Sequence, residues 1–376
     1  MQDRGGYDYT LLFAIIFIAC FGLVMVYSSS SYVAYTQFGS SFYFFKRQAF
    51  FMLLGIAAMF VVSKIDYHLW LKFAVLGILS AIVLMLLVNF TPFGIEFNGK
   101  KRWFGIAGHS LFQAAEYVKI VLIIGLAAYV NRVGKRVDKW PTIVITALIS
   151  IPLCLLVAMN NLSTGIILVG ITFVMVYIAS QKKVLYIILV VLAVVGGVSA
   201  VFLGDQFVKM GILKPYQFER IYVWLDPEAY ALEGGHQVIQ GLYAIGSGGL
   251  FGKGLGKSLQ KLGFVPEARN DMIFSIICEE LGVIGALALI AMFMFVIYRL
   301  FRAAINAPDL VGAMITIGVM THIAIQVILN VAVVTNTIPN TGVTLPFISY
   351  GGTSVIFLFL EIGLALSVSN LSRCKR

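Results

Sequence analysis

The chain has 376 residues, of which 60% are hydrophobic and only 12% are charged. A soluble domain carries about a quarter charged residues, so this composition excludes an ordinary soluble protein. The net charge of +10 does not indicate a nucleic-acid partner, because the basic residues are spread along the chain and form no single stripe.

The apolar residues form ten blocks, each about as long as a bilayer-crossing helix, which needs roughly 17 to 25 residues. A backbone in lipid must satisfy its own hydrogen bonds, and the alternation typical of a membrane barrel is absent. We therefore predict an all-α, polytopic membrane protein formed by one domain, 1–376. The first block follows a charged start and lacks a small-residue cleavage site, so we do not interpret it as a removable signal peptide. The predicted spans are 8–28, 48–63, 69–89, 111–131, 141–159, 162–181, 184–203, 272–298, 309–333 and 347–370.

The placement of lysine and arginine predicts the orientation. Ends and loops of one parity hold fourteen basic residues and are expected in the cytoplasm together with both termini. They are Arg4, Lys64, Lys72, Arg132, Lys135, Arg136, Lys139, Lys182, Lys183, Arg299, Arg302, Arg373, Lys375 and Arg376. The short loops of opposite parity hold only Lys46, Arg47, Lys100, Lys101 and Arg102. These five bind lipid headgroups or, alternatively, form a site for an anionic substrate on the outer face.

Cysteine and histidine do not indicate a metal site or a disulfide framework, because neither residue type shows the spacing of ligands or bridges. These residues are Cys20, Cys154, Cys278, Cys374, His68, His109, His236 and His322.

A polar segment opens the predicted fourth span. Gln113, Glu116 and Lys119 follow the basic run that ends at Arg102. Glu116 and Lys119 are three residues apart on a helix, so they either pair with each other or take separate roles. In the functional reading, Lys119 joins Arg47 and Arg102 to bind a diphosphate, for which arginine offers bidentate donors.

One connection, 204–270, is unusually long for a link between helices and is expected outside the membrane, between spans seven and eight. It contains Tyr216, Arg220 and the turn-like Asp226-Pro227 before a run of glycines at 246–256. The run is not a nucleotide-binding P-loop, because its first glycine would fall on Phe251. We expect these glycines to shape a loop that dips onto the membrane surface.

Asp271 lies at the mouth of the eighth span, where an ionisable group is costly and is a functional candidate by default. Two interpretations are open: the carboxylate caps the helix N-terminus, or it acts as a general base toward a bound hydroxyl. Ser275 and Cys278 are expected on the same helical face as Asp271, with Glu279 partly off it and Glu280 opposite.

The segment Pro339–Ser354 has two prolines and three glycines at a span boundary, which predicts broken backbone that lines a cavity. It includes Ser349, Gly351 and Gly352. Gln326 and Asn330 lie four residues apart in span nine, where hydrogen bonds between helices are the simpler explanation. Glu361 lies deep in span ten and is expected in a buried pair.

Three blocks of this sequence resemble the SEDS family (shape, elongation, division and sporulation proteins). The first is Arg102-Trp with Gln113, Glu116 and Lys119. The second runs from the Gly-Ser-Gly-Gly loop through Pro-Glu-Ala-Arg-Asn-Asp-Met-Ile-Phe to Glu-Glu-Leu-Gly, and the third is Thr-Gly-Val-Thr-Leu-Pro-Phe-Ile-Ser-Tyr-Gly-Gly-Thr-Ser. The similarity covers the whole chain, and the third block is most similar to division-type or sporulation members of the family.

The resemblance implies a ten-span peptidoglycan glycosyltransferase of the bacterial cytoplasmic membrane, active on the outer face. It would polymerise lipid II into an undecaprenyl-diphosphate-linked glycan together with a class B penicillin-binding protein, a transpeptidase, and other division or elongation proteins. The essential aspartate of the family maps onto Asp271. Its basic and polar positions map onto Arg47, Arg102, Glu116 and Lys119.

Two departures from the family pattern stand out. Arg269-Asn270 replaces the usual His-Thr, and Asn160-Asn161-Leu-Ser-Thr replaces Pro-Asp-Leu-Gly-Thr. Loss of that second aspartate puts its assigned roles in doubt, including metal binding, so no cofactor is assigned and a divalent cation (Mg²⁺ or Mn²⁺) stays open.

The mechanism expected is an inverting transfer. Asp271 deprotonates the acceptor 4-hydroxyl, while Arg47, Arg102, Lys119 and Arg269 stabilise the departing diphosphate. Glu116, Gln113, Glu279, Ser349, Gly351 and Gly352 are expected in supporting positions. Two other classes remain open: a lipid transporter that flips the precursor, for which fold offers no exclusion, and a scaffold for wall enzymes.

Overall fold

The computed structural model describes the chain except residues 1–7, 98–99, 107–108, 211–214 and 375–376. Arg4, Lys375 and Arg376, which entered the orientation prediction, lie outside the described residues, as do the side chains of Lys100, Tyr216, Arg373 and Cys374.

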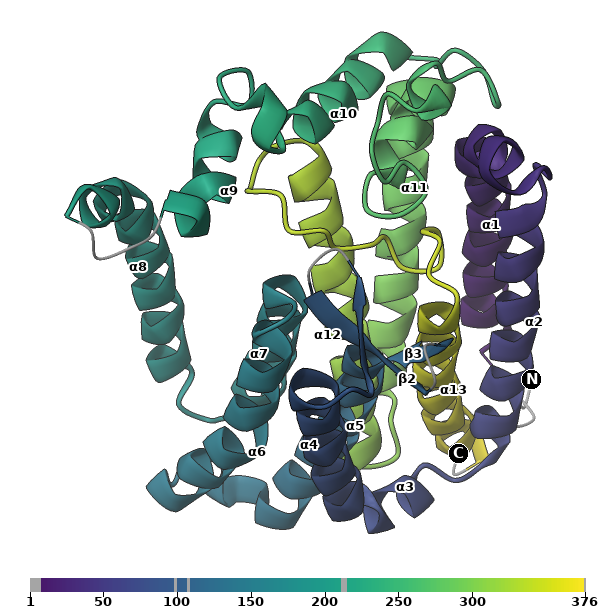
Figure 1. The fold of residues 1–376 in the computed structure, drawn as a ribbon. Coiled ribbons are helices and arrows are strands. Elements are labelled where there is room, and N and C mark those ends of the chain that lie inside the picture. The colour runs from purple at the N-terminus through teal and green to yellow at the C-terminus, as the bar shows by residue number, and fades with distance from the viewer. Residues whose placement is uncertain (1–7, 98–99, 107–108, 211–214, 375–376) are drawn as a thin grey trace.

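The structure is a helical bundle, which confirms the predicted fold class (Figure 1). Within the described residues, eight helices are long and apolar enough to cross a membrane. They are α1 (Tyr9–Phe38), α2 (Tyr43–Lys64), α5 (Ala114–Val133), α6 (Trp140–Ala158), α7 (Leu162–Ala179), α11 (Ile273–Ile305), α12 (Leu310–Val334) and α13 (Thr353–Cys374). Two further apolar stretches, in α4 (Ala74–Phe90) and α8 (Lys183–Lys209), match the remaining predicted spans. The short helix α3 (His68–Lys72) precedes α4.

A small antiparallel sheet was not anticipated. Its strand order is β1 (Gly94–Phe97), β2 (Lys100–Ile106) and β3 (His109–Gln113). In the register, Ile95 lies opposite Trp103, and Phe104 lies opposite Phe112. Aromatic and β-branched pairs of this kind favour strands. The fourth span therefore begins at Ala114 instead of 111, and the sheet fixes where Arg102 enters the site.

Several helix bounds differ from the predicted spans, and α1 and α2 are two examples. α1 continues to Phe38 and, at 1.5 Å per residue, is about 45 Å long, more than the roughly 30 Å of a bilayer core. α2 already begins at Tyr43, so Lys46 and Arg47 lie in its first turns and not in a loop. The apolar blocks predicted the apolar middle of each helix. The turns that extend beyond a block are more polar, so hydropathy did not reveal them.

The long connection 204–270, which was predicted to lie outside the membrane, contains several helical segments. After α8 it forms α9 (Pro215–Leu225), the turn η2 (Ala231–Glu233), α10 (Gly235–Gly248) and the turn η3 (Gln260–Leu262). The first glycines of the run end α10, and the later ones form a loop that packs on α11 (Figure 1). A Cβ at Gly282 would lie 2.4 Å from Gly252 N, and Gly282 has φ of +69°, so glycine is required where this loop meets α11.

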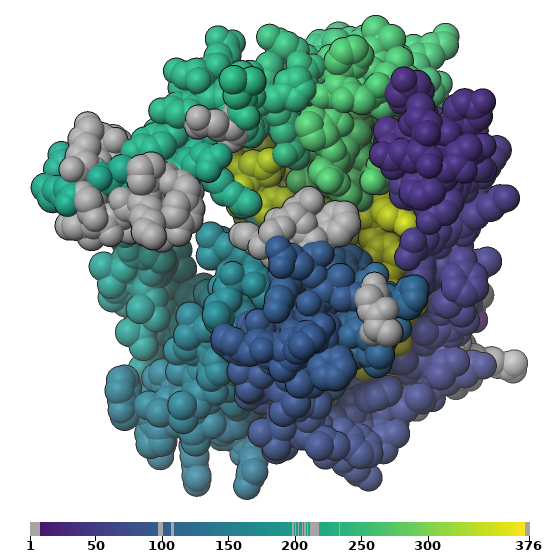
Figure 2. Space-filling view, in the orientation of Figure 1, coloured from purple at the N-terminus to yellow at the C-terminus, as the bar shows by residue number. Residues whose placement is uncertain are grey.

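α8 stands at the edge of the bundle, and its main contacts are with α7 and α9 (Figure 1). Apolar side chains along it, such as Val191 and Leu192, are exposed, and a Cβ at Gly196 or Gly197 would meet nothing within 4 Å. The surface is hollowed between α8 and the rest of the molecule (Figure 2). This region therefore offers apolar surface on more than one side of a membrane-length helix.

Candidate functional site

Asp271 is held where α10, α11 and α12 meet. α11 begins only at Ile273, and its N-cap residue is Met272 without a side-chain cap, so Asp271 is not the capping residue. The carboxylate is 8% exposed, and its Oδ2 accepts a 3.4 Å hydrogen bond from Gln237 Nε2 of α10. Within the described part of the chain its Oδ1 has no hydrogen-bond partner. Asp271 thus carries a buried oxygen that no described group satisfies.

The electrostatic surroundings favour the protonated form of this carboxyl. Burial raises the pKa of Asp271 to about 7, the negative charge of Glu267 adds to the rise, and hydrogen bonds from Gln237 and the backbone oppose it. A base with a pKa near the working pH is well matched to proton abstraction, since enough of it is deprotonated and its conjugate acid is not too strong.

The broken segment between α12 and α13 closes over Asp271, and its irregular backbone agrees with the prediction. Asn330 Nδ2 donates to the carbonyls of Asp271 (2.8 Å) and Val343 (2.7 Å), and Gln326 Nε2 donates to Thr344 O (2.9 Å). Gly342, with φ of +68°, lies beside the carboxylate, because a Cβ there would be 3.7 Å from Asp271 Oδ2. Gln326 and Asn330 thus hold this segment, which corrects the expectation of hydrogen bonds between helices.

Ser349 and Tyr350 join the same segment to the residues just before Asp271. Ser349 Oγ donates to Asn270 O (2.6 Å) and accepts from Leu345 N (2.7 Å), and Tyr350 N donates to Arg269 O (2.8 Å). Ser349 therefore supports the site through the backbone.

Gln48 of α2 fixes the two glycines that were predicted as supporting residues. Its Oε1 lies 3.4 Å from the amides of Gly351 and Gly352, and its Nε2 donates to Ser349 O (3.3 Å). Sequence reasoning missed Gln48; the available signal was a polar residue at the start of an apolar block.

Arg47 and Arg269 form one cationic side of the site. The Arg269 guanidinium lies 4.2 Å from the Phe44 ring centroid, and Phe44 also packs edge-on against Tyr350. Burial raises the pKa of the Tyr350 hydroxyl, and the nearby charges of Arg47 and Arg269 oppose the rise. Both arginines thus lie near the Tyr350 hydroxyl, and their role toward a diphosphate stays a prediction.

Arg102 approaches from another direction. Its Nε donates to Asn160 O (3.2 Å), and it lines a small pocket with Lys101, Gln113, Asn160 and Asn161. Burial lowers the pKa of Arg102, Arg220 lowers it further, and the negative charge of Asp271 opposes both. Arg102 is therefore within electrostatic reach of Asp271.

In the segment 160–164, where the sequence departs from the family pattern, two side chains make structural hydrogen bonds. Asn161 Oδ1 accepts from Thr164 N (3.2 Å) and caps α7, and Ser163 Oγ donates to Thr341 O. Arg220 Nη1 donates to Asn340 O (3.2 Å), so α9 also braces the segment over Asp271. Arg220 was noted in the sequence but given no role.

Lys119 does not share the surroundings of the three arginines. It is 1% exposed, and its Nζ contacts Glu116 Oε1 (2.9 Å) and His322 Nε2 (2.8 Å). His322 Nδ1 in turn lies 2.6 Å from Glu361 Oε2. The pairing of Glu116 with Lys119 and the buried pair expected for Glu361 are both present, and they belong to one cluster.

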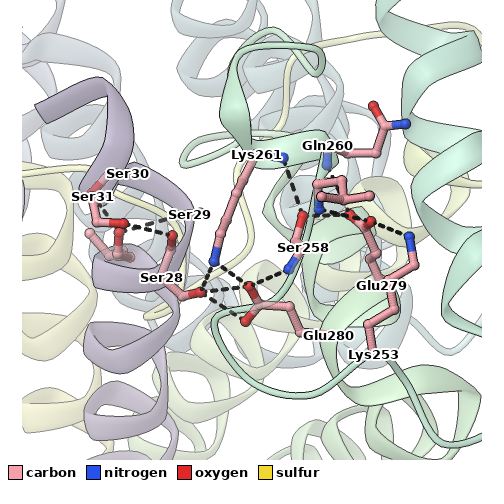
Figure 3. A network of polar contacts seen from close by, with 12 residues as sticks. Ser28, Ser29, Ser30, Ser31, Lys253, Ser258, Gln260, Lys261, Glu279 and Glu280 are labelled. Atoms are coloured by element: carbon pink, nitrogen blue, oxygen red, sulfur yellow. Dashed lines mark hydrogen bonds and ion pairs between the residues drawn. The ribbon is translucent and has the colours of Figure 1, made fainter. Parts of the chain in front are cut away.

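Glu279 and Glu280 anchor the glycine-rich loop (Figure 3). Both are fully buried. Glu279 accepts from Lys253 Nζ (2.7 Å), Ser258 Oγ and the amides of Leu259 and Gln260. Glu279 therefore supports the site from a distance.

Glu280 ties the same loop to α1. Its oxygens accept from Ser28 Oγ (2.7 and 2.8 Å) and from Lys261 Nζ (2.8 Å), and Lys261 also donates to Ser28 (3.0 Å). Figure 3 shows these groups pointing toward one another from three segments. Ser28 and Lys261 were not singled out in the sequence, where their pairing over more than 200 residues leaves no signal.

The described side chains alone do not form a metal site. Across the described residues there is no group of three or more His, Cys, Asp or Glu that could hold an ion. The side-chain contact of the Asp271 carboxylate is with the Gln237 amide nitrogen, which is not a metal ligand. An Mg²⁺ or Mn²⁺ ion here would need oxygens from a substrate diphosphate.

Comparison with known proteins identifies the family. The family described as cell cycle protein, which comprises FtsW, RodA and SpoVE, matches residues 9–374. Stage V sporulation protein E of Bacillus subtilis (strain 168) is 36% identical over 97% of this chain and 98% of its own. The probable peptidoglycan glycosyltransferase FtsW of Geobacter sp. (strain M18) is 35% identical over 99% of both chains.

A solved structure described as structural coordination of polymerization and crosslinking by a peptidoglycan synthase complex contains a similar chain. It superposes with a TM-score of 0.79 at 27% identity and covers 98% of both chains. The protein therefore belongs to the FtsW, RodA and SpoVE family of multi-pass membrane proteins, the SEDS family.

Proposed function

We propose that this protein is a peptidoglycan glycosyltransferase that polymerises lipid II on the outer face of the cytoplasmic membrane, with Asp271 as the general base. The observation that carries the proposal is the state of Asp271, which is buried, has one free oxygen and has a pKa raised to about 7. The names of the relatives agree with this enzyme class.

In the proposed reaction, Asp271 removes the proton of the acceptor 4-hydroxyl as that oxygen attacks the anomeric carbon of the donor. The bond from the anomeric carbon to the diphosphate breaks, and the configuration inverts. Arg102 on one side and Arg47 with Arg269 on the other stabilise the charge that grows on the diphosphate. Lys119 is paired with Glu116 and His322 and is given no direct part in this step.

The hollow beside α8 suits the lipid part of the substrate. Apolar side chains on α8 are exposed, and the surface is hollowed beside this helix in the space-filling view (Figure 2). A polyprenyl tail in that region stays in the membrane while its diphosphate reaches the basic residues. With the tail in the membrane and the diphosphate at the basic residues, the reaction centre can lie at the membrane boundary.

The proposed partner is a class B penicillin-binding protein. The similar solved chain belongs to a peptidoglycan synthase complex, and its extensive coverage of this chain supports a comparable assembly. Polymerisation of fluorescent lipid II with and without such a transpeptidase tests the partnership. A scaffold would show no polymerisation in either case, and a transporter would move the lipid without lengthening glycan.

The base is tested with purified Asp271→Asn, which keeps the shape of the side chain but cannot accept the proton. A general base contributes about 10² to 10⁴ in rate, so we expect polymerisation to fall by about 10³. Asp226→Asn makes the same chemical change at an exposed residue of the same connection and should retain full activity. Wild-type turnover by folded Asp271→Asn would contradict the proposal.

A further inference from the structure

Four titratable side chains form a buried chain of contacts beneath the site. Glu116 and Lys119 come from α5, His322 from α12 and Glu361 from α13. The contacts along the chain measure 2.9, 2.8 and 2.6 Å. His322 lies at the midpoint of α12, so its surroundings are the middle of a membrane-length helix. Ionisable groups at this depth are costly and are typical of proton pathways.

The hydrogen-bond contacts of His322 determine which of its ring nitrogens donates and which accepts. A lysine ammonium only donates hydrogen bonds, so Nε2 of His322 must accept, and the single proton of the neutral ring lies on Nδ1, toward Glu361. The four side chains thus form a continuous line of proton donors and acceptors.

A line of polar side chains on α12 runs from this cluster toward Asp271. His322, Gln326 and Asn330 are spaced by four residues and so lie along one side of the helix, about 12 Å from first to last. Asn330 reaches the Asp271 carbonyl at 2.8 Å. Buried oxygens of Gln326, Asn330 and Asp271 have no partner among the described groups. Buried polar atoms of this kind are commonly satisfied by water, which also conducts protons.

The opposite end of the cluster, Glu116, is next in sequence to a residue that lines the pocket beside Arg102. The side chain of Glu116 is 10% exposed, whereas those of His322 and Glu361 are 0% and 1% exposed. Ala115, next to Glu116, lines that pocket together with Arg102 and Gln113. A proton that enters at His322 and Glu361 can therefore be replaced by another that leaves from Glu116.

We propose that the Glu116–Lys119–His322–Glu361 cluster is a proton-transfer site that clears the catalytic proton from Asp271 along the polar side of α12. This inference rests on Asp271 acting as the base. Formation of each glycosidic bond leaves the hydroxyl proton on Asp271. Bound acceptor and donor cover the outer side of that residue, so the proton passes through water beside Asn330 and Gln326 to the cluster. One proton enters the cluster, one leaves at Glu116 to water in the pocket, and Asp271 is ready for the next transfer.

The test uses His322→Gln and Glu361→Gln in the full-length protein, with steady-state polymerisation of lipid II in H₂O and D₂O. Each variant keeps a polar group in place but removes a site that binds a proton. We expect kcat to fall about tenfold or more with KM unchanged, and the solvent isotope effect on kcat to increase, because proton removal becomes rate-limiting. Thr316→Val is the control, because Thr316 is equally buried on α12 and its hydroxyl bonds only within that helix.

Wild-type kcat in both folded variants would overturn the proposal. So would a loss of activity that matches a loss of thermal stability while the isotope effect stays unchanged, since that pattern indicates a structural cluster. If neither variant folds, Gln326→Met interrupts the polar line without changing the cluster charges, and an unchanged isotope effect there overturns the proposal. Activity of Asp271→Asn would instead refute the base itself, so the two failures are distinguishable.

Discussion

Asp271 lies only eight residues before the Glu279–Glu280 pair. All three carboxylates are buried, but their hydrogen bonding is opposite. Glu279 and Glu280 each accept from at least three donors, including a lysine, and fasten a loop to α11 and α1 (Figure 3). Asp271 has one long side-chain hydrogen bond and a free oxygen. Burial alone therefore does not mark a reactive group; a buried carboxylate that is left partly unsatisfied does.

The largest loss of folding stability should come from a change at Glu280, whose carboxylate is fully hydrogen-bonded. Glu280→Gln leaves the buried Lys261 ammonium without its counter-charge, and removing one partner of a buried pair costs about 3 to 5 kcal/mol. Thermal unfolding in detergent should show a clear decrease in the unfolding temperature. Adding Lys261→Met should restore most of it, and a single variant as stable as wild type would contradict the anchoring role.

The next largest effect should be on turnover, with little change in folding. Arg102→Glu replaces a cation within reach of Asp271 by an anion, and loss of such stabilisation costs about 10² in kcat. Lys257→Glu makes the same charge change at an exposed residue of the glycine-rich loop and should leave kcat unchanged. Equal activities of the two variants would exclude Arg102 from diphosphate binding.

A smaller effect is expected where the anchored loop meets α11. Gly282→Ala forces a side chain into positive φ and within 2.4 Å of Gly252 N, which should cost about 1 to 3 kcal/mol. Gly196→Ala on α8 is the control, because a Cβ there meets nothing within 4 Å. A stable Gly282→Ala protein would show that the contact between the loop and α11 is loose.

The sequence predicted the helical spans and singled out Asp271 because both leave local signals: long apolar blocks, and a lone carboxylate at the end of one. It also indicated broken backbone at 339–354 from prolines and glycines. The contacts of Gln48 with Gly351 and of Ser28 with Glu280 join residues far apart in the chain, and no local pattern reveals them.

The predicted set of four cations illustrates the same limit. The sequence shows these four residues only as four positive charges, whereas the structure places them in different surroundings. They are Arg47, Arg102, Lys119 and Arg269. Lys119 is drawn into the cluster with His322 because α5 and α12 pack together, whereas Arg102 is placed by the sheet that hydropathy did not reveal. Their separation depends on tertiary packing and strand pairing.

The pH dependence of kcat for lipid II polymerisation tests the central claim most directly. Burial raises the pKa of Asp271 to about 7, and only the deprotonated carboxylate can accept the hydroxyl proton, so activity should be lost as pH falls. We expect half-maximal kcat near pH 7 and a decrease of about tenfold per pH unit below it. A kcat that stays constant down to the ordinary range of a carboxyl, about pH 4, would contradict a partly unsatisfied, buried Asp271 as the base.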